Sequence, residues 1–424
     1  MRVLWVSPNG GNFASDEIMG TGGWVGSLEK SIIESNINIE LAIVFISEIY
    51  SAPMTIGKVT YYPVYYPKQN NLQKLNSRWF NKQEQYEDDI LQKMCSCVKS
   101  FKPEVIHVWG IENFYAKIIS RTKVPCVVHI QGFASSIIEH YLPEGVTLLD
   151  LKKIDGIINV NILKRGHYHS YLQFEQRVNN EQLMSKYVKY WMGRTEWDHA
   201  LSFCLNSEAK YFHCDELMRP EFYKKRWQYR YDGVLRIQSS ISDTWYKGID
   251  IVLKTAKLLK KIGVNFVWNV YGVDSMSSIL GFFIKKLKIM PSDVNVTFNG
   301  RVCGEKIQNG LLSSDVYVHP SNIENSSNAI AEAMCVGIPI VAQYVGGNPS
   351  MLKDDSGKLV QSNDPFSLSY AIISMINKDN AELYSHNARK TAYYRHNPNN
   401  VLNDLVMVYQ LIINENGQSK NSRK

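Results

Sequence analysis

Short runs of apolar, β-branched residues alternate with amphipathic segments along the chain. In the first half these runs predict strands over residues 3–6, 41–46, 105–109 and 124–130. Between the first two strands, apolar positions 25, 28, 32 and 33 recur at helical spacing and predict a helix over residues 24–34. Such an alternation of strands and helices is typical of a parallel sheet with helices on both faces.

A second series of strands and helices starts near residue 234. It predicts strands over residues 234–238, 265–272, 294–299 and 315–318, and helices over residues 249–260, 306–313 and 400–415. Residues 216–232 are polar and aromatic without a clear period, so we expect them to connect two domains. We expect domains over residues 1–215 and 216–399. Residues 400–424 then form a C-terminal helix that packs back toward the first domain and a polar tail, frayed from Asn416 onward.

The composition is that of an ordinary globular protein, with 45% hydrophobic and 21% charged residues among 424. No apolar run approaches the roughly 18 residues that cross a bilayer, and the start of the chain reads as a strand rather than a signal peptide. The seven cysteines are scattered, which favours free thiols and a cytoplasmic location. The net charge of +7 suits a phosphate-bearing substrate or an anionic membrane surface. No nucleic-acid recognition module is found, so we expect no nucleic-acid partner.

The most informative stretch is residues 319–342, which reads as a strand end, a polar loop, a short helix and a further strand. Gly337 predicts a left-handed end to the helix. Four polar residues crowd the start of the helix: Asn325, Ser326, Ser327 and Asn328. Unpaired backbone N–H groups and the helix dipole bind a phosphate well at such a place. Glu332 shares a face with Asn328 and is predicted to point at a ribose, while Glu324 lies eight residues earlier on the loop facing the ligand.

This arrangement resembles the E-x7-E signature of retaining glycosyltransferases of the GT-B fold, the group 1 or family 4 class. The Pro-Ser before Glu324, the Glu-Ala-Met that starts at Glu332, the Gly-Ile-Pro stop and the Val-Gly-Gly at 345–347 fall where that family has them. The resemblance implies an α/β protein with two Rossmann-like domains that face each other across a deep cleft. It also implies that a sugar is transferred with retention from a nucleotide diphosphate donor, that Glu324 holds the sugar hydroxyls, and that Glu332 holds the ribose.

The resemblance places further donor contacts around the diphosphate. Lys247 precedes a predicted helix, where the family has a lysine that grips the diphosphate. A mobile ammonium suits a leaving group whose charge grows in the transition state. Gly22 and Gly23 match a glycine pair that faces the diphosphate from across the cleft. Many members carry an arginine six residues before the lysine, where this chain has Ile241, so part of the phosphate clamp has no assigned residue.

The nucleotide base and the acceptor have their own expected contacts. Gly300, Arg301 and Val302 end a predicted strand, and the resemblance implies that they hold the base largely through the backbone. Backbone contacts do not separate uracil from guanine, and we favour a UDP-sugar over a GDP-sugar. Gln131 lies where many members place a histidine near the reacting sugar, and glutamine binds a hydroxyl without acting as a base. Arg194 belongs to a segment similar to one in bacterial capsule and exopolysaccharide glycosyltransferases, and we expect it to contact a sugar acceptor.

The chain has no D-x-D sequence and no convincing cluster of histidine ligands, so we expect neither a metal nor a cofactor. The expected partners are a nucleotide-sugar donor, a glycan or lipid-linked glycan acceptor in cell-surface polysaccharide synthesis, and the inner face of a membrane as a peripheral contact. Two alternatives remain open. One is a nucleotide-sugar epimerase or phosphorylase of the same fold. The other is a non-catalytic binding subunit that partners an active transferase. This alternative rests on Gln131 and Ile241, which differ from the residues that many family members have at these positions.

Overall fold

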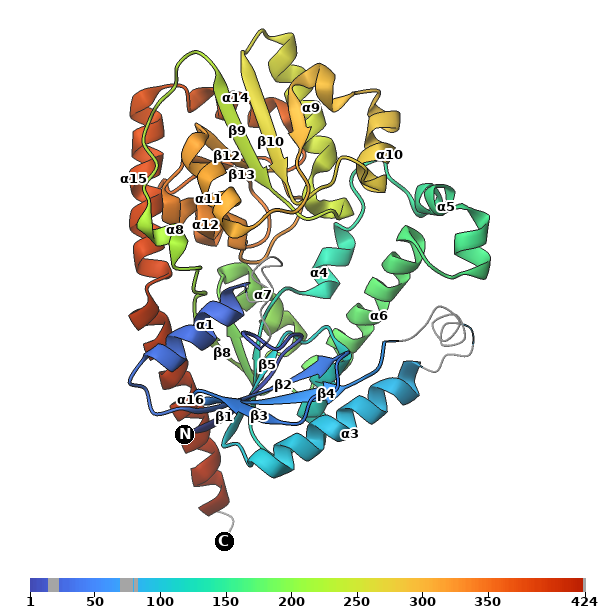
Figure 1. Cartoon of the computed structure of the whole chain (residues 1–424), viewed down its shortest axis with the longest axis vertical. Helices are drawn as coiled ribbons and strands as arrows, with labels where there is room; N and C mark the ends of the chain where they lie inside the picture. The colour runs from blue at the N-terminus through green and yellow to red at the C-terminus, as the bar shows by residue number, and fades with distance from the viewer. Residues whose placement is uncertain (14–22, 69–78, 80–82, 422–424) are drawn as a thin grey trace.

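The computed structural model describes residues 1–13, 23–68, 79 and 83–421, and it contains two parallel β-sheets, each flanked by helices (Figure 1). The first is an eight-stranded sheet in the order β3-β4-β2-β1-β5-β6-β7-β8. Its strands are β1 (Arg2–Val6), β2 (Glu40–Ser47), β3 (Met54–Ile56), β4 (Val59–Tyr65), β5 (Val105–Trp109), β6 (Cys126–His129), β7 (Tyr190–Gly193) and β8 (Lys210–His213). Neighbouring strands pair in parallel except β3 and β4, which form a hairpin.

The second sheet has six parallel strands in the order β11-β10-β9-β12-β13-β14. They are β9 (Leu235–Ser240), β10 (Phe266–Tyr271), β11 (Val296–Phe298), β12 (Val316–His319), β13 (Ile340–Gln343) and β14 (Lys358–Val360). The order reverses between β9 and β12, because the chain first builds outward through β10 and β11 and then returns to the other side of β9. Ligands of open α/β sheets bind at such a reversal, beyond the carboxyl ends of the strands.

Helices cover both sheets. The helices of the first half are α1 (Gly23–Glu34), α3 (Gln83–Phe101), η1 (Phe114–Arg121), α4 (Ala134–Glu139), α5 (Leu148–Ile157), η2 (Ile158–Ile162), α6 (His167–Ser185) and α7 (Glu196–Leu205). The later helices are α8 (Glu221–Lys224), η3 (Trp245–Lys247), α9 (Ile249–Lys261), α10 (Ser278–Leu287), η4 (Pro291–Val294), α11 (Gly304–Ser313), α12 (Asn328–Val336), α13 (Asn348–Met351), α14 (Pro365–Ser374), α15 (Lys378–Arg395) and α16 (Pro398–Asn421). None of the described helices is long and apolar enough to cross a membrane.

The predicted strands and helices of the second half are all present, with ends that differ by at most a few residues. The helix predicted over residues 249–260 is α9, and its apolar stripe, which includes Ile249, Val252 and Ala256, is fully buried. The frayed end predicted from Asn416 onward is wrong, because α16 continues to Asn421 and the Asn416 side chain donates a hydrogen bond to the Tyr190 hydroxyl at 3.0 Å. A polar sequence remains helical here because one face still finds a partner on the first sheet.

The last helix crosses back to the first sheet, as Figure 1 shows by its red ribbon beside β1. Tyr409 of α16 is fully buried, and its hydroxyl accepts a hydrogen bond from the indole nitrogen of Trp5 at 3.1 Å. The same hydroxyl lies 2.6 Å from Nδ1 of His107 on β5. The C-terminal helix therefore completes the core of the first sheet, although the segments just before it belong to the second.

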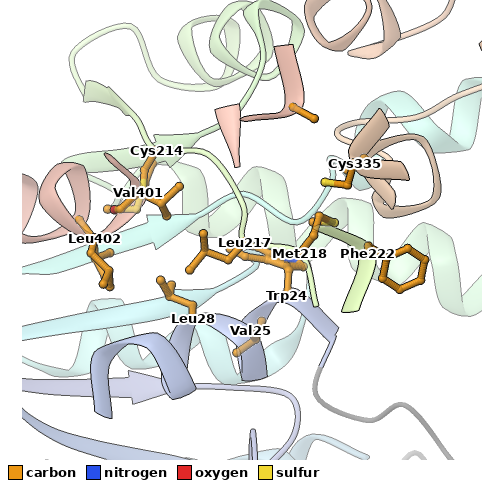
Figure 2. Close-up of a cluster of buried hydrophobic side chains, with 14 of the residues drawn as sticks. Trp24, Val25, Leu28, Cys214, Leu217, Met218, Phe222, Cys335, Val401 and Leu402 are labelled. Carbon is orange, nitrogen blue, oxygen red and sulfur yellow. The ribbon is translucent and has the colours of Figure 1, made fainter. Parts of the chain in front are cut away.

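A hydrophobic cluster joins the two halves of the molecule (Figure 2). Trp24 and Leu28 of α1 lie in it beside Leu217 and Met218 of the connecting segment. The cluster continues to Cys335 of α12 and to the start of α16. The connection at residues 216–232 thus contributes buried side chains to this cluster, among them Phe222 and Trp227, while several of its polar residues are exposed.

Candidate active site at the carboxyl ends of β9 and β12

A cavity of about 290 Å³ lies beyond the ends of β9 and β12. It is lined by the end of β9, by the lysine of η3, and by the loop and first turn of α12. The lining residues are Ser240, Ile241, Ser242, Lys247, His319, Glu324, Ser326, Ser327, Asn328 and Ala329. The structure therefore brings together Lys247 and Glu324, which lie 77 positions apart in the chain.

Four side chains form a continuous chain of polar contacts at this cavity. The Lys247 ammonium donates to Glu324 Oε1 at 2.5 Å, and His319 Nε2 donates to the same oxygen at 2.8 Å. On its other side, His319 Nδ1 lies 3.2 Å from the hydroxyl of Tyr317, which is fully buried in β12. The second oxygen of Glu324 has no part in these two bonds. The histidine therefore fixes the direction of the carboxylate, and the lysine balances its charge.

The protonation of Glu324 follows from these neighbours. Burial alone would raise its pKa, but the adjacent Lys247 ammonium and the hydrogen bond from His319 outweigh burial and hold the pKa well below its usual range. Glu324 is therefore an anion at any pH near neutrality. An ionised carboxylate only accepts hydrogen bonds, so it suits the binding of hydroxyl groups.

The helix beside this carboxylate begins where the sequence predicts. Ser327 is the N-cap of α12, and its hydroxyl accepts a hydrogen bond from the backbone N–H of Ile330 at 3.4 Å. Gly337 ends the helix with a φ of +79°, a left-handed conformation that favours glycine. Ser327 and Asn328 line the cavity, so the positive end of the helix dipole is directed into it.

Two other residues of the predicted phosphate loop contact the junction between the two halves of the molecule. The Ser326 hydroxyl donates to the fully buried carboxylate of Glu216 at 3.0 Å, and Asn325 Oδ1 accepts from the hydroxyl of Thr195, the N-cap of α7, at 3.1 Å. Burial would raise the pKa of Glu216, but Arg395 and the other nearby cations bring it down to about 2. The loop at the cavity is thus tied directly to the junction between the two sheets.

The helical pattern predicts that Glu332 points freely toward a ligand. In the structure Glu332 does not line the cavity, and its side chain already has a partner. Its Oε1 accepts a hydrogen bond from Arg219 Nη2 at 2.6 Å. The guanidinium of Arg219 also lies 4.7 Å from the centre of the Phe222 ring. It approaches Gly304 so closely that a Cβ atom on residue 304 would be 2.0 Å from Arg219 Nη1. Burial raises the pKa of Glu332, and Arg219 opposes this shift. A ribose would therefore meet a carboxylate that already has one cationic partner.

The residues predicted to hold the base form a tight turn after β11. Gly300 has a φ of +66°, its N–H donates to the carbonyl of Val273 at 2.9 Å, and its own carbonyl accepts from Gly272 at 2.7 Å. Arg301 is exposed and Val302 is half-buried. None of the three is among the lining residues of the 290 Å³ cavity, so their role as base contacts stays a prediction.

Across from the second sheet, Gly23 begins α1 with a φ of +45° and open space around its Cβ position. Gly22 lies outside the described residues. Gln131 follows β6 and is half-buried, with Nε2 at 3.5 Å from the carbonyl of His129. The ring of His129 stacks on Trp109 at 5.0 Å, and burial lowers its pKa well below the ordinary value. His129 is therefore a neutral core residue, and Gln131 is the one that reaches the surface.

Arg194 is not a surface contact for an acceptor, and that prediction needs correction. Its side chain is 2% exposed, and Nη2 donates to the carbonyl of Ile130 at 3.2 Å. The guanidinium also lies 4.7 Å from the ring of Trp24 and 3.6 Å from Glu216. A polar residue that follows a strand looks exposed in the sequence, but here the second half of the molecule covers it. In this conformation Arg194 binds the two halves to each other and is closed to a sugar.

Two residues of the site region went unpredicted. His319 is the last residue of a buried strand, which places its side chain at the ligand end of the sheet, and that position is the signal that points to it. Arg219 gives no such signal, because it lies in the connecting segment 113 positions from Glu332 and nothing local distinguishes it from a surface arginine.

Comparisons with known proteins find likenesses to this architecture. Residues 235–378 match the model of the family "Glycosyl transferases group 1". The chain is 30% identical over 156 residues to the putative colanic acid biosynthesis glycosyltransferase WcaL of Escherichia coli K12, which covers 35% of this chain and 38% of the relative. The fold is GT-B, and the chain resembles a group 1 glycosyltransferase.

Solved structures extend the likeness to the whole chain at the level of the fold. Sucrose-phosphate synthase from Thermosynechococcus elongatus superposes with a TM-score of 0.66 at 13% identity, over 99% of this chain and 98% of that one. The Anabaena protein HepE, solved in complex with UDP and glucose, gives a TM-score of 0.60 at 13% identity, over 97% and 99% of the two chains. The sequence matches are shorter, since the chain spans about two fifths of the length of the first curated relatives that it matches.

Proposed function

We propose that this GT-B protein transfers a sugar from a nucleotide diphosphate donor to a hydroxyl of a glycan or lipid-linked glycan, with retention of the anomeric configuration. The observation that carries the proposal is the contact of Lys247 and His319 with the Glu324 carboxylate, at a cavity that also receives the start of α12. A cation, an anion and a helix N-terminus are the groups that a sugar diphosphate requires.

Binding of the donor would separate the Lys247–Glu324 pair. The diphosphate competes with Glu324 for the ammonium, since both are anions within reach of the same Nζ. The carboxylate keeps its hydrogen bond from His319 and is then free to accept hydrogen bonds from the sugar hydroxyls. The backbone N–H groups at Ser327 and Asn328 would take the remaining phosphate oxygens.

The reaction breaks the bond between the anomeric carbon and the diphosphate oxygen and forms a bond from the acceptor oxygen to the same carbon. The acceptor proton leaves with the diphosphate or passes to water, so the protein needs no strong base. Charge grows on the leaving oxygen as the old bond breaks, and a pre-placed ammonium lowers the barrier at that moment. Exclusion of water between the two halves limits hydrolysis of the donor.

The comparisons support a UDP-sugar as donor and a bacterial surface polysaccharide as product. HepE is a relative in fold that was solved with UDP and glucose, and WcaL is named for colanic acid biosynthesis. Gln131, half-buried just after β6, would bind a sugar hydroxyl. We place the protein in the cytoplasm, with a peripheral contact to the inner face of the membrane.

The proposal is tested by incubating the protein with a panel of UDP- and GDP-sugars and measuring release of the nucleotide, with and without a glycan acceptor. Release of UDP and a new glycoside of retained configuration are expected. Interconversion of nucleotide sugars without release would favour the epimerase. Binding of UDP with no turnover on any donor would favour a non-catalytic subunit.

Replacement of Glu332 by alanine is expected to weaken nucleotide binding about ten- to a hundredfold. A hydrogen bond to a charged group contributes roughly 1.5 to 3 kcal/mol, which gives that range. Titration calorimetry with UDP measures the effect, and the exposed Glu382 of α15, changed to alanine, is the matched control. UDP affinity equal to that of the wild type in Glu332→Ala would remove Glu332 from the ribose site.

Turnover is expected to survive chelation of divalent ions. Lys247 and the helix start provide the positive charge that a metal supplies to the diphosphate in D-x-D enzymes, and no D-x-D sequence is present. The measurement compares rates in EDTA with rates in Mg²⁺ or Mn²⁺. A rate that disappears in EDTA and returns with either ion would show that a metal takes part.

A further inference from the structure

A group of large apolar side chains is exposed on the outer face of α5 and η2. Leu149 is 58% exposed, Ile157 77% and Ile158 64%, and Ile162 follows one turn later. Single exposed apolar residues are normal on protein surfaces, but four large ones within 14 positions are an unusual concentration. We call residues 148–165 the α5–η2 tip. In Figure 1, α5 lies at the edge of the molecule, away from both sheets.

The tip is held firmly in place, so its outward side chains are not those of a loose loop. Thr147 and Asp150 form a capping box at the start of α5. Leu151 on the inner face is fully buried. The carboxylate of Asp155 accepts hydrogen bonds from the backbone of His167 at 2.9 Å and of Tyr168 at 2.8 Å, the first residues of α6.

Basic side chains surround the apolar face. The tip contains four of them: Lys152, Lys153, Lys164 and Arg165. Its two acidic residues are already engaged, Asp150 in the capping box and Asp155 in the cap of α6. Lys164 lies 4.1 Å from the ring of Trp79, whose indole nitrogen donates to the carbonyl of Ile162 at 3.0 Å. An apolar face with cations and an amphipathic tryptophan beside it is the chemistry of a membrane interface.

We propose that the α5–η2 tip inserts its apolar side chains into an anionic lipid bilayer, with its basic residues on the headgroups. The partner is a membrane and not a second copy of the chain, because a copy carries the same basic tip and a net charge of +7. This inference rests on the proposed function, since it brings a lipid-linked acceptor to the site.

The tip also connects to the candidate active site. Leu151 belongs to one hydrophobic cluster with Tyr141 and with Trp245 of η3. Tyr141 packs against Tyr246 at 5.7 Å, and the ammonium of Lys247 lies 5.3 Å from the Tyr246 ring. The tip and the region around Lys247 are therefore linked by a row of packed side chains.

The test is sedimentation of the full chain with vesicles of phosphatidylglycerol and phosphatidylcholine, compared with vesicles of phosphatidylcholine alone. Each lysine near an anionic surface contributes about fivefold in binding, so Lys152→Gln with Lys153→Gln should lose about 25-fold. The triple variant Leu149→Ser, Ile157→Ser, Ile158→Ser should lose at least about tenfold. The control Phe366→Ser with Tyr370→Ser removes two equally exposed aromatic residues from α14 and should bind like the wild type.

UDP affinity, measured on every variant, reports separately on the donor site. Wild-type protein that binds UDP and stays in the supernatant would overturn the membrane inference and leave the proposed function intact. Equal sedimentation of the triple variant, or equal binding to vesicles without phosphatidylglycerol, would also overturn it. If the wild type forms a dimer and the triple variant does not, the tip contacts a second copy of the chain and the membrane inference is overturned. Failure of the wild type to bind any nucleotide would instead count against the proposed function.

Discussion

Replacement of Lys247 by alanine should lower kcat about 100- to 1,000-fold while donor binding weakens much less. The ammonium stands at the cavity beside Glu324, and the removal of one pre-placed group that stabilises developing charge typically has an effect of about that size. A diphosphate is charged before it reacts, so some affinity is lost as well. The charge on the leaving oxygen grows only as the bond breaks, which concentrates the effect in turnover. With Ile241 at the position of the family's usual arginine, Lys247 is the only lysine or arginine among the described residues that line the cavity.

Initial rates at saturating donor, together with UDP titrations, separate the two effects. Lys247→Arg should restore activity only in part, because a planar guanidinium does not replace a compact point charge. Lys257 is exposed on the next helix, and its replacement by alanine controls for loss of positive charge in general. An unchanged kcat with a raised KM would show that Lys247 binds ground state and transition state equally.

Glu324→Gln should abolish measurable transfer and also destabilise the second half of the protein. The variant keeps the shape of the side chain but removes the anion that Lys247 and His319 share. Loss of one partner of a buried ion pair costs about 3 kcal/mol of unfolding free energy. Since the pKa of Glu324 is held below its ordinary value of 4.5, its stabilising effect is present above that pH and is lost as the pH falls through the lower pKa of the folded state.

The gap in unfolding free energy between wild type and Glu324→Gln should therefore be widest near pH 7 and shrink toward pH 3. Urea denaturation at several pH values measures it, and the exposed Glu305, changed to glutamine, provides the control. A difference in unfolding free energy that stays constant with pH would mean that Lys247 and His319 do not lower the pKa of the Glu324 carboxyl. Normal transfer in the variant would exclude Glu324 from the donor sugar.

The sequence predicts most of the fold, since apolar periodicity is strongest where elements are buried on one side. Strands β9 and β10 and helix α9 are predicted because most of their buried apolar positions face one core, and β12 is predicted because it is buried along its whole length. Strand β3 is missed, since Met54 and Ile56 are exposed there and the pattern carries no inward face. The end of α16 is missed for another reason, because its polar sequence contacts residues that are distant in the chain, among them Tyr190 and Lys210.

The site is predicted as far as its residues lie near one another in the chain. Glu324 and the start of α12 belong to one motif, and local rules for strand ends and helix caps place them correctly. The pairing of Glu332 with Arg219 and the burial of Arg194 depend on how the two halves meet, which no local pattern records. The resemblance to a family predicts that Lys247 belongs to the site. The hydrogen bond from His319 to Glu324 is seen only in the structure.

The return of α16 to the first sheet has a consequence for recombining such proteins. The Tyr409 hydroxyl contacts both Trp5 and His107, so the core of the first half includes a helix whose tyrosine lies 404 positions after Trp5. A chimaera made by one crossover near residue 216 would join α16 of one parent to the sheet of another and leave that core mismatched. A workable exchange of donor domains requires two crossovers, one before residue 216 and one near Pro398, so that the final helix travels with its own strands.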